Sequence, residues 1–97
     1  MVLLPAAYET AAARWWDILY PANALANGQW WIMANQHGGD LFGGSQIIAP
    51  DGGVVAAAPR GDDSPGHLVA TIGFDEPPRE CGPMLAGRRP ELYGAFP

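Results

Sequence analysis

Residues 34–53 bring together several polar residues and glycines that could take part in chemistry. They read Ala-Asn-Gln-His-Gly-Gly-Asp-Leu-Phe-Gly-Gly-Ser-Gln-Ile-Ile-Ala-Pro-Asp-Gly-Gly. Asn35 ends one apolar run, a glycine-rich loop follows, and Ser45 stands at the start of the next apolar run. A glycine-rich loop that ends in Ser first suggests phosphate binding.

The residues that follow this loop argue against phosphate binding. A phosphate cradle places its glycines before a helix N-terminus, so that free N–H groups and the helix dipole face the anion. Here Gly43-Gly44-Ser45 leads into Gln46-Ile47-Ile48 and then a Pro-Asp-Gly turn, which is a strand pattern, and no Gly-Lys-Ser/Thr occurs. The glycines instead let residues 36–44 fold tightly, with Ser45 forming a local hydrogen bond to the backbone.

Cys81 is the only thiol, but its surroundings do not favour a nucleophile. An activated Cys needs a neighbouring base or a helix N-terminus that stabilises the thiolate. Cys81 lies between Glu80 and Gly82-Pro83, and the adjacent carboxylate disfavours the thiolate. We therefore assign no catalytic residue within this chain.

The other titratable residues do not form a metal site or an acid–base pair. His37 and His67 are far apart, and neither has a Cys or His partner two to five residues away. The acidic pairs Asp62-Asp63 and Asp75-Glu76 stand beside Gly, Ser and Pro and indicate solvated loops. We expect no metal and no cofactor.

Composition limits the class of protein. The 97 residues are 48% hydrophobic and 15% charged, with a net charge of −5 and no Lys, which argues against disorder and against a nucleic-acid partner. A single Cys excludes an internal disulfide and favours a reducing, cytoplasmic location. No apolar run approaches the length of a signal peptide or a membrane span, so no membrane association is expected.

The expected elements are one helical segment and several strands. Residues 2–4 indicate the end of a buried strand, and residues 10–27 a helix that Pro21 kinks or splits and Gly28 ends. Residues 30–34 suit a strand covered on both faces. Adjacent Trp residues, 15-16 and 30-31, point in different directions, so one of each pair can face the core while its neighbour faces another layer, covered by something not in this sequence.

The second half of the chain predicts a meander. Residues 46–49 and 54–58 flank Pro50-Asp51-Gly52-Gly53, which predicts a tight hairpin turn at Asp51-Gly52. Residues 67–74 alternate in polarity, which predicts a strand with Leu68, Ile72 and Phe74 towards the core. Prolines and glycines after Asp75 predict an extended tail. The fold class is α/β with a mixed sheet.

These segments resemble the second half of the carbon–nitrogen hydrolase (nitrilase-like) superfamily. The resemblance rests on Leu3-Leu4-Pro5-Ala6, Asn27-Gly28, Ala34-Asn35, the glycine-rich loop up to Gly44-Ser45, and Arg88-Arg89-Pro90-Glu91-Leu92-Tyr93. The chain departs from the family at two helix positions, where Asn23 and Ala26 replace an Arg and a Glu that help anchor the helix.

The resemblance implies a partial αββα sandwich: residues 1–76 form the C-terminal portion of the hydrolase domain and residues 77–97 an extended interface tail. It implies pocket-wall residues Asn35, His37, Phe42, Gly44 and Ser45, and interface residues Arg88, Arg89 and Tyr93. Family members hydrolyse small amides or nitriles through a Cys thioester, with Glu as base and Lys stabilising the oxyanion. All three residues are expected upstream of this sequence.

The expected function is therefore scaffold and pocket wall for an amidase or nitrilase, in a homo-oligomer, with no activity in the chain itself. Two alternatives remain open. The chain could be a non-catalytic oligomerisation or interaction module, or a truncated reading frame without function.

Overall fold

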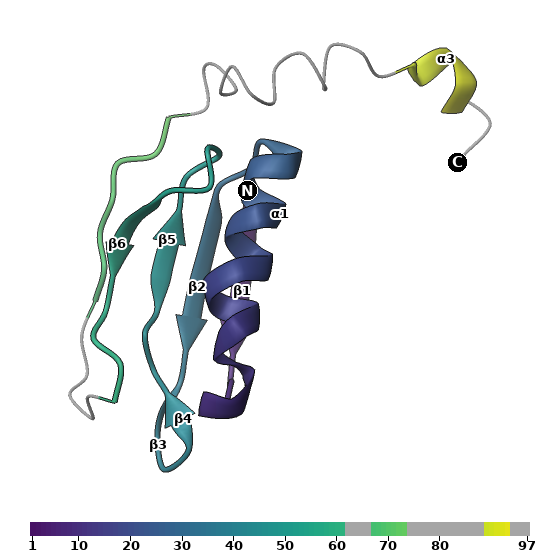
Figure 1. Ribbon diagram of the computed structural model, residues 1–97. Coiled ribbons are helices and arrows are strands. Elements are labelled where there is room, and N and C mark those ends of the chain that lie inside the picture. Colours follow the sequence, from purple (N-terminus) through teal and green to yellow (C-terminus); the bar gives the residue numbers. More distant parts are fainter. Residues whose placement is uncertain (62–66, 74–88, 94–97) are drawn as a thin grey trace.

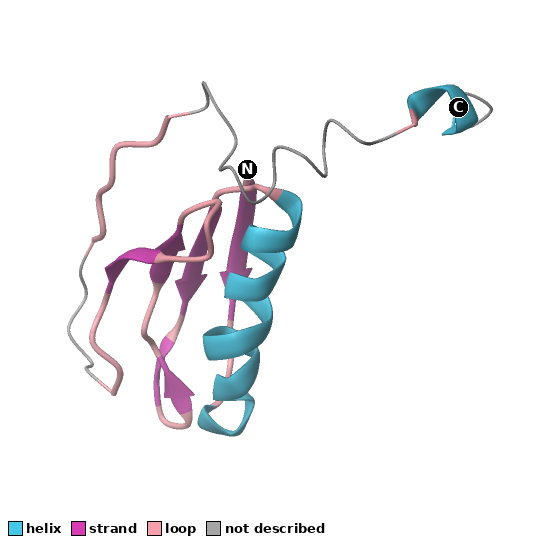
Figure 2. Ribbon diagram, turned by 45° about the horizontal axis from the view of Figure 1, so that its top comes forward, coloured by secondary structure: helices cyan, strands magenta, loops and turns pink. Residues whose placement is uncertain are grey.

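The computed structural model describes residues 1–61, 67–73 and 89–93. The first of these ranges forms a helical layer on one face of a mixed sheet (Figures 1 and 2). The four-stranded sheet has the order β1-β2-β5-β6, and a second sheet pairs β3 with β4. The strands are β1 (Val2–Ala6), β2 (Trp31–Asn35), β3 (His37–Gly38), β4 (Leu41–Phe42), β5 (Gln46–Ile48) and β6 (Val54–Ala57). The expected α/β class with a mixed sheet is confirmed.

Strands β1 and β2 are parallel, and the helical segment between them supplies the crossover. Their register pairs Leu3 with Ile32 and Ala6 with Asn35, so both strands end at the same edge of the sheet. The strand expected at residues 2–4 extends through Pro5 to Ala6. It is half-buried rather than buried, because only alternate side chains face the helix and Leu3 is 62% exposed.

The helical segment covers residues 10–27, as expected, but its winding changes twice. It begins with a 3-10 turn, η1 (Thr10–Ala12), continues as a π-helical stretch, η2 (Trp15–Leu19), and ends as α1 (Tyr20–Asn27). Pro21 lies in the first turn of α1, where a missing N–H group is tolerated, so the change of winding falls at the expected position. Gly28 ends the helix in the left-handed region at φ 60° and donates to the carbonyls of Ala24 and Leu25.

The core lies between the helix and the sheet and is rich in aromatic side chains. Trp16 is fully buried and meets the rings of Tyr8, Tyr20 and Phe42 edge-on at centroid distances of 5.5–6.2 Å. Its neighbour Trp15 is 55% exposed, which confirms that adjacent Trp residues face different surroundings. The remaining buried core residues are Ala24, Met33, Phe42 and Ile48.

The hairpin predicted after residue 46 is confirmed. Strands β5 and β6 pair antiparallel through a turn in which Gly52 N donates to Ala49 O at 2.9 Å. Gly52 takes φ 83°, and Asp51 Oδ1 accepts from Gly53 N at 2.8 Å, so the Asp and the glycines each have a role in the turn. A register shift between Ile47 and Ile48 bends the ladder.

The strand predicted at residues 67–74 is wrong for the described residues 67–73, which form no strand pairs. The segment runs back along β6 (Figure 1) and is tied to the sheet by Trp30 Nε1, which donates to Gly73 O at 3.0 Å. Side-chain burial still alternates, with Leu68 and Ile72 half-buried and Val69 88% exposed. Alternating polarity predicts which side chains face inward, but strand pairing also requires a neighbouring strand edge in the correct register. Phe74 lies outside the described residues.

Within the tail, only residues 89–93 are described, and they contain a helical turn, α3 (Pro90–Tyr93), where an extended chain was expected. Pro90 suits the first position of a helix, and Leu92 N donates to Arg89 O at 2.9 Å. Arg89 is exposed and pairs with Glu91. Arg88 lies outside the described residues, so the interface role expected for Arg88, Arg89 and Tyr93 stays a prediction.

Candidate functional site

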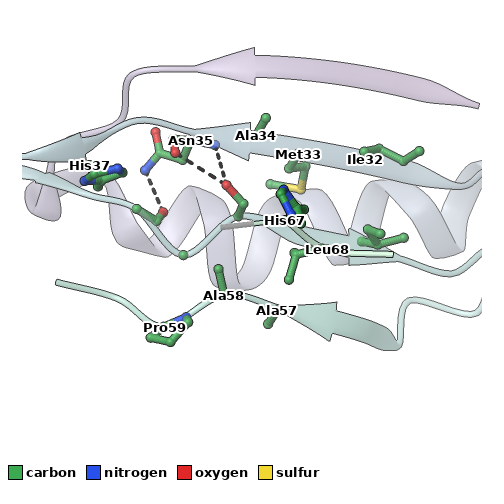
Figure 3. A pocket seen from close by; sticks show the side chains of 14 residues that line it. Ile32, Met33, Ala34, Asn35, His37, Ala57, Ala58, Pro59, His67 and Leu68 are labelled. Carbon is green, nitrogen blue, oxygen red and sulfur yellow. Dashed lines mark hydrogen bonds between the residues drawn. The ribbon is translucent and has the colours of Figure 1, made fainter. Parts of the chain in front are cut away.

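A cavity of about 520 Å³ opens on the face of the sheet that the helix does not cover (Figure 3). Four of the five predicted pocket-wall residues line it: Asn35, His37, Gly44 and Ser45. Side chains at the carboxyl ends of adjacent parallel strands converge on one edge of a sheet, where α/β proteins commonly bind ligands. The other lining residues are Ile32, Met33, Ala34, Gly43, Ile47, Ala57, Ala58, Pro59, His67 and Leu68.

Phe42, the fifth predicted residue, is not among the lining residues. It is 5% exposed and packs in the core, with its ring 5.6 Å from that of Trp16. Strand β4 places Phe42 next to Gly43 and Gly44, whose left-handed conformations turn the chain towards β5. The reversal separates Phe42 from Ser45, which faces the cavity.

Asn35 joins three segments at the end of β2. Its Oδ1 accepts from Tyr8 N at 2.7 Å, while its Nδ2 donates to Tyr8 O at 3.3 Å and Gly43 O at 2.8 Å. Both amide hydrogens are therefore used, and the side chain is 8% exposed. Asn35 fixes the chain after β1 and the glycine loop to β2, so its role in the cavity wall is to position backbone.

Ser45, directly before β5, ties this strand to the end of β2. Its Oγ accepts from Asn35 N at 3.0 Å and lies 3.4 Å from Asn35 O. Ser45 therefore bonds to backbone as expected, but the partner is Asn35, ten residues away on the neighbouring strand, and not the local backbone.

Two histidines border the cavity from separate segments. His37 begins β3 directly after the β2 edge, and His67 begins the segment that returns along β6. Figure 3 places His37 and Asn35 towards one end of the cavity and His67 with Leu68 beside Met33. Sequence spacing could not bring His67 to this wall, because its position depends on how the chain returns after β6.

Gly44 lies between the core and the cavity, and two features of its position require a glycine. Its φ of 67° lies in the left-handed region, and an added Cβ would lie 2.8 Å from Arg60 Cγ. On its other side, the buried Trp16 Nε1 donates to Gly44 O at 2.8 Å. Gln46 Nε2 in turn donates to Trp16 O at 3.0 Å, which links helix, loop and β5.

Arg60 closes the outer side of this loop. Its guanidinium lies 5.1 Å from the centre of the Phe42 ring and forms a two-pronged ion pair with Asp17, Nη1 to Oδ2 at 3.1 Å. The hydrogen bond from Arg60 lowers the pKa of Asp17, although partial burial opposes the shift. Both side chains are about half exposed, so the pair contributes at most about 1 kcal/mol.

We expect Gly44→Ala to destabilise the fold by more than Gly39→Ala. Both glycines are left-handed, which costs about 1–2 kcal/mol for Ala. Only at Gly44 would the methyl group meet Arg60, which adds an overpacking cost of about 1–3 kcal/mol; nothing lies within 4 Å at Gly39.

Urea unfolding of the two variants measures this difference. In an Arg60→Ala background the penalty at Gly44 should fall towards that at Gly39, because the clash is gone and only the backbone strain remains. Equal penalties at both glycines in the parent background would contradict the close approach of Arg60.

The sequence of this chain matches the model of a known protein family. The carbon-nitrogen hydrolase family matches residues 6–76, which include the helix, the sheet after β1 and the cavity wall. This chain belongs to the carbon–nitrogen hydrolase family. No curated protein matches it.

The sequence of this carbon–nitrogen hydrolase family member contains no Lys. All five of its basic residues other than His are Arg. Cys81 lies outside the described residues. Within 1–61, 67–73 and 89–93, no group of three His, Cys, Asp or Glu side chains could hold a metal ion.

The hydrolase chain also shows no membrane-crossing element in its described parts. None of the helices there has both the length and the apolar character that crossing a bilayer requires.

Proposed function

We propose that this chain forms the scaffold and one pocket wall of a nitrilase-like hydrolase that acts on a small non-peptide amide or nitrile. Two observations support the proposal. The chain belongs to the carbon–nitrogen hydrolase family, and a cavity with polar groups lies where β1 and β2 both end. The sequence contains no Lys, which supports proposing a non-catalytic part for this chain.

In the proposed reaction, groups outside these 97 residues perform the chemistry. A Cys thiolate attacks the amide or nitrile carbon, a Glu transfers the proton, and a Lys stabilises the negative charge that develops. From an amide, ammonia or an amine leaves and a thioester remains; from a nitrile, the thioimidate formed first adds a water and then releases ammonia to give the same thioester. A further water hydrolyses the thioester to the acid and frees the thiol. The residues of this chain hold the wall in place: Asn35 and Ser45 lock the strand ends, and Gly43-Gly44 shape the loop.

We expect the purified chain to release no ammonia above background from small amides or nitriles. Without a positioned nucleophile, base and Lys, the many kcal/mol of barrier reduction that hydrolysis requires are not supplied. Cys81→Ser should leave this background unchanged. Thiol-dependent turnover by the purified chain would contradict the proposal.

The positive arm of the test supplies the missing groups. Co-expression with a family N-terminal segment that carries Glu, Lys and Cys should give ammonia release, which is lost when the Cys of that segment is replaced. Activity that persists after this replacement, or that depends on Cys81, would show that the nucleophile belongs to this chain and would contradict the proposal.

The runner-up function is a non-catalytic interaction module. The observation that favours it is the exposed apolar side of the helix, where Trp15 and Ile18 are 55% and 63% exposed. Hydrolysis after co-expression distinguishes the two functions, because an interaction module alone would give none.

A further inference from the structure

The cavity on the uncovered face of the sheet has a polar end and a largely apolar remainder. The polar end is formed by Asn35, Ser45 and the glycine loop, where β1 and β2 both finish. None of the described residues that line the cavity is Asp, Glu, Lys or Arg, so His37 and His67 supply its ionisable side chains. The apolar side chains along the remainder include Ile32, Ala34, Ile47, Ala57, Ala58 and Leu68.

The polar side chains at the strand ends are already engaged within the protein. Both amide hydrogens of Asn35 go to the carbonyls of Tyr8 and Gly43. Ser45 Oγ accepts from Asn35 N at 3.0 Å and its hydroxyl lies 3.4 Å from Asn35 O. His37 has an interaction of its own. Asn35 and Ser45 therefore offer a ligand no unused donor.

His67 differs from these residues because its imidazole is unused. Within the part of the chain that the structure describes, this side chain has no hydrogen bond or ion pair, although it lines the cavity. Figure 3 shows His67 with Leu68 beside Met33, on the apolar part of the wall. The segment that carries His67 is held in place, since Leu68 is half-buried and Trp30 Nε1 donates to Gly73 O at 3.0 Å.

The chemistry of imidazole decides which ligand group suits this position. A neutral imidazole has one N–H donor and an imidazolium has two, so His67 can donate in either protonation state. The complementary ligand group is therefore an acceptor. The net charge of −5 disfavours an anion, and no Arg of the described cavity wall could pair with a carboxylate. An uncharged oxygen, such as that of a ketone or an ether, meets both conditions.

We propose that His67 is a specificity-determining residue that donates a hydrogen bond to an uncharged oxygen on the carbon chain of the amide or nitrile substrate. The carbon chain lies along the apolar wall, and the group to be hydrolysed lies at the polar end. This inference rests on the proposed hydrolase function and names the substrate class of that site: oxygen-bearing aliphatic amides or nitriles are preferred over plain alkyl ones of the same length.

The first test follows the two histidines of the purified chain by nuclear magnetic resonance. Because the sequence contains only two His, two imidazole Cε1–H resonances are expected, and His37→Gln and His67→Gln assign them. Titration with 4-oxopentanamide should shift the His67 resonance saturably, and pentanamide at the same concentrations should shift it less. An unchanged His67 resonance, or equal shifts with the two amides, would overturn the proposal.

The second test measures ammonia release by the chain co-expressed with a family N-terminal segment. The ratio of kcat/KM for 4-oxopentanamide to that for pentanamide should fall about 3- to 10-fold in His67→Leu, the size of one net hydrogen bond. His67→Gln keeps an N–H donor and should retain most of the preference. Val69→Leu is the matched control on the same segment, since Val69 is 88% exposed, and it should leave the ratio unchanged.

The outcomes separate this inference from the proposed function. Ammonia release with the same ratio in the parent and in His67→Leu would overturn the role of His67 and leave the hydrolase function intact. Release from neither amide would contradict the proposed function, and the resonance titration, which needs no turnover, would still decide whether His67 binds the oxygen.

Discussion

Trp16→Ala should remove a large fraction of the free energy of unfolding of this chain. Trp16 is fully buried, and its ring contacts three other aromatic rings. Replacing a buried Trp by Ala costs about 3–5 kcal/mol. A domain of this size has a total stability of about 5–15 kcal/mol, so the loss is a large fraction of the whole.

A second substitution separates packing from hydrogen bonding at the same residue. Trp16→Phe keeps most of the ring contacts but removes the N–H group, which leaves Gly44 O without its donor. An unpaired buried carbonyl costs about 1–3 kcal/mol. We expect Trp16→Phe to fall between the parent and Trp16→Ala in urea-induced unfolding.

Trp15→Ala is the matched control, because Trp15 is the exposed neighbour on the same helix. Its effect on the free energy of unfolding should stay within about 1 kcal/mol when measured at a concentration where the chain is monomeric. Similar losses for Trp15→Ala and Trp16→Ala would contradict the assignment of which Trp faces the core.

Local sequence rules predicted the elements whose cause is local. The hairpin turn follows from Asp51 and Gly52, and the helix end follows from Gly28, because these residues favour specific backbone conformations wherever they occur. The Trp pairs indicated two differently facing surfaces, because successive helical residues point in different directions. Such features need no knowledge of distant contacts.

Features that depend on contacts across the chain were not predictable in the same way. Residues 67–73 alternate like a strand but do not pair, and His67 reaches the cavity only through the return of the chain along β6. Phe42 is adjacent in sequence to residues that line the cavity, yet its side chain packs in the core against the ring of Trp16. No sequence motif marks Arg60, although its ion pair with Asp17 links the segment after β6 to the helix.

The predicted wall residues differ in how they act, and this follows from their hydrogen bonds. Asn35 ends a strand, as the sequence indicated, but both of its amide hydrogens are used by backbone carbonyls of Tyr8 and Gly43. It has no free donor for a ligand. Substituting Asn35 should therefore change the free energy of unfolding and the conformation of the glycine loop before it changes any contact with a ligand.

Asn35→Asp should destabilise the fold, and the loss should grow as the pH rises. The substitution keeps the acceptor for Tyr8 N but removes the two donors, so the new carboxyl group faces two carbonyl oxygens at a buried position. Burial and these acceptors favour the protonated form and raise the pKa of this carboxyl group above about 3.9, the ordinary value for Asp. The protonated form can still donate one hydrogen bond.

The direction of the pH effect follows from proton linkage. The folded variant binds the proton more tightly than the unfolded chain, so the variant is closest to the parent below the unfolded pKa and loses stability as the pH rises through the folded pKa. The quantity to measure is the difference in unfolding free energy between variant and parent at each pH, because other groups then cancel. We expect this difference to reach about 2–4 kcal/mol near neutral pH, as two buried carbonyls lose their donors.

Asn27→Asp is the control, since Asn27 is exposed and donates only to Asn23 O at 2.9 Å. Its effect should stay below about 1 kcal/mol, the size of an unfavourable charge at a helix C-terminus. Asn35→Leu completes the series: it removes the two donors and also the acceptor for Tyr8 N, without adding a titratable group, so its loss should not change between acid and neutral pH. A small, pH-independent difference for Asn35→Asp, no larger than that of Asn27→Asp, would show that the position is open to water and that Asn35 does not hold the strand ends together.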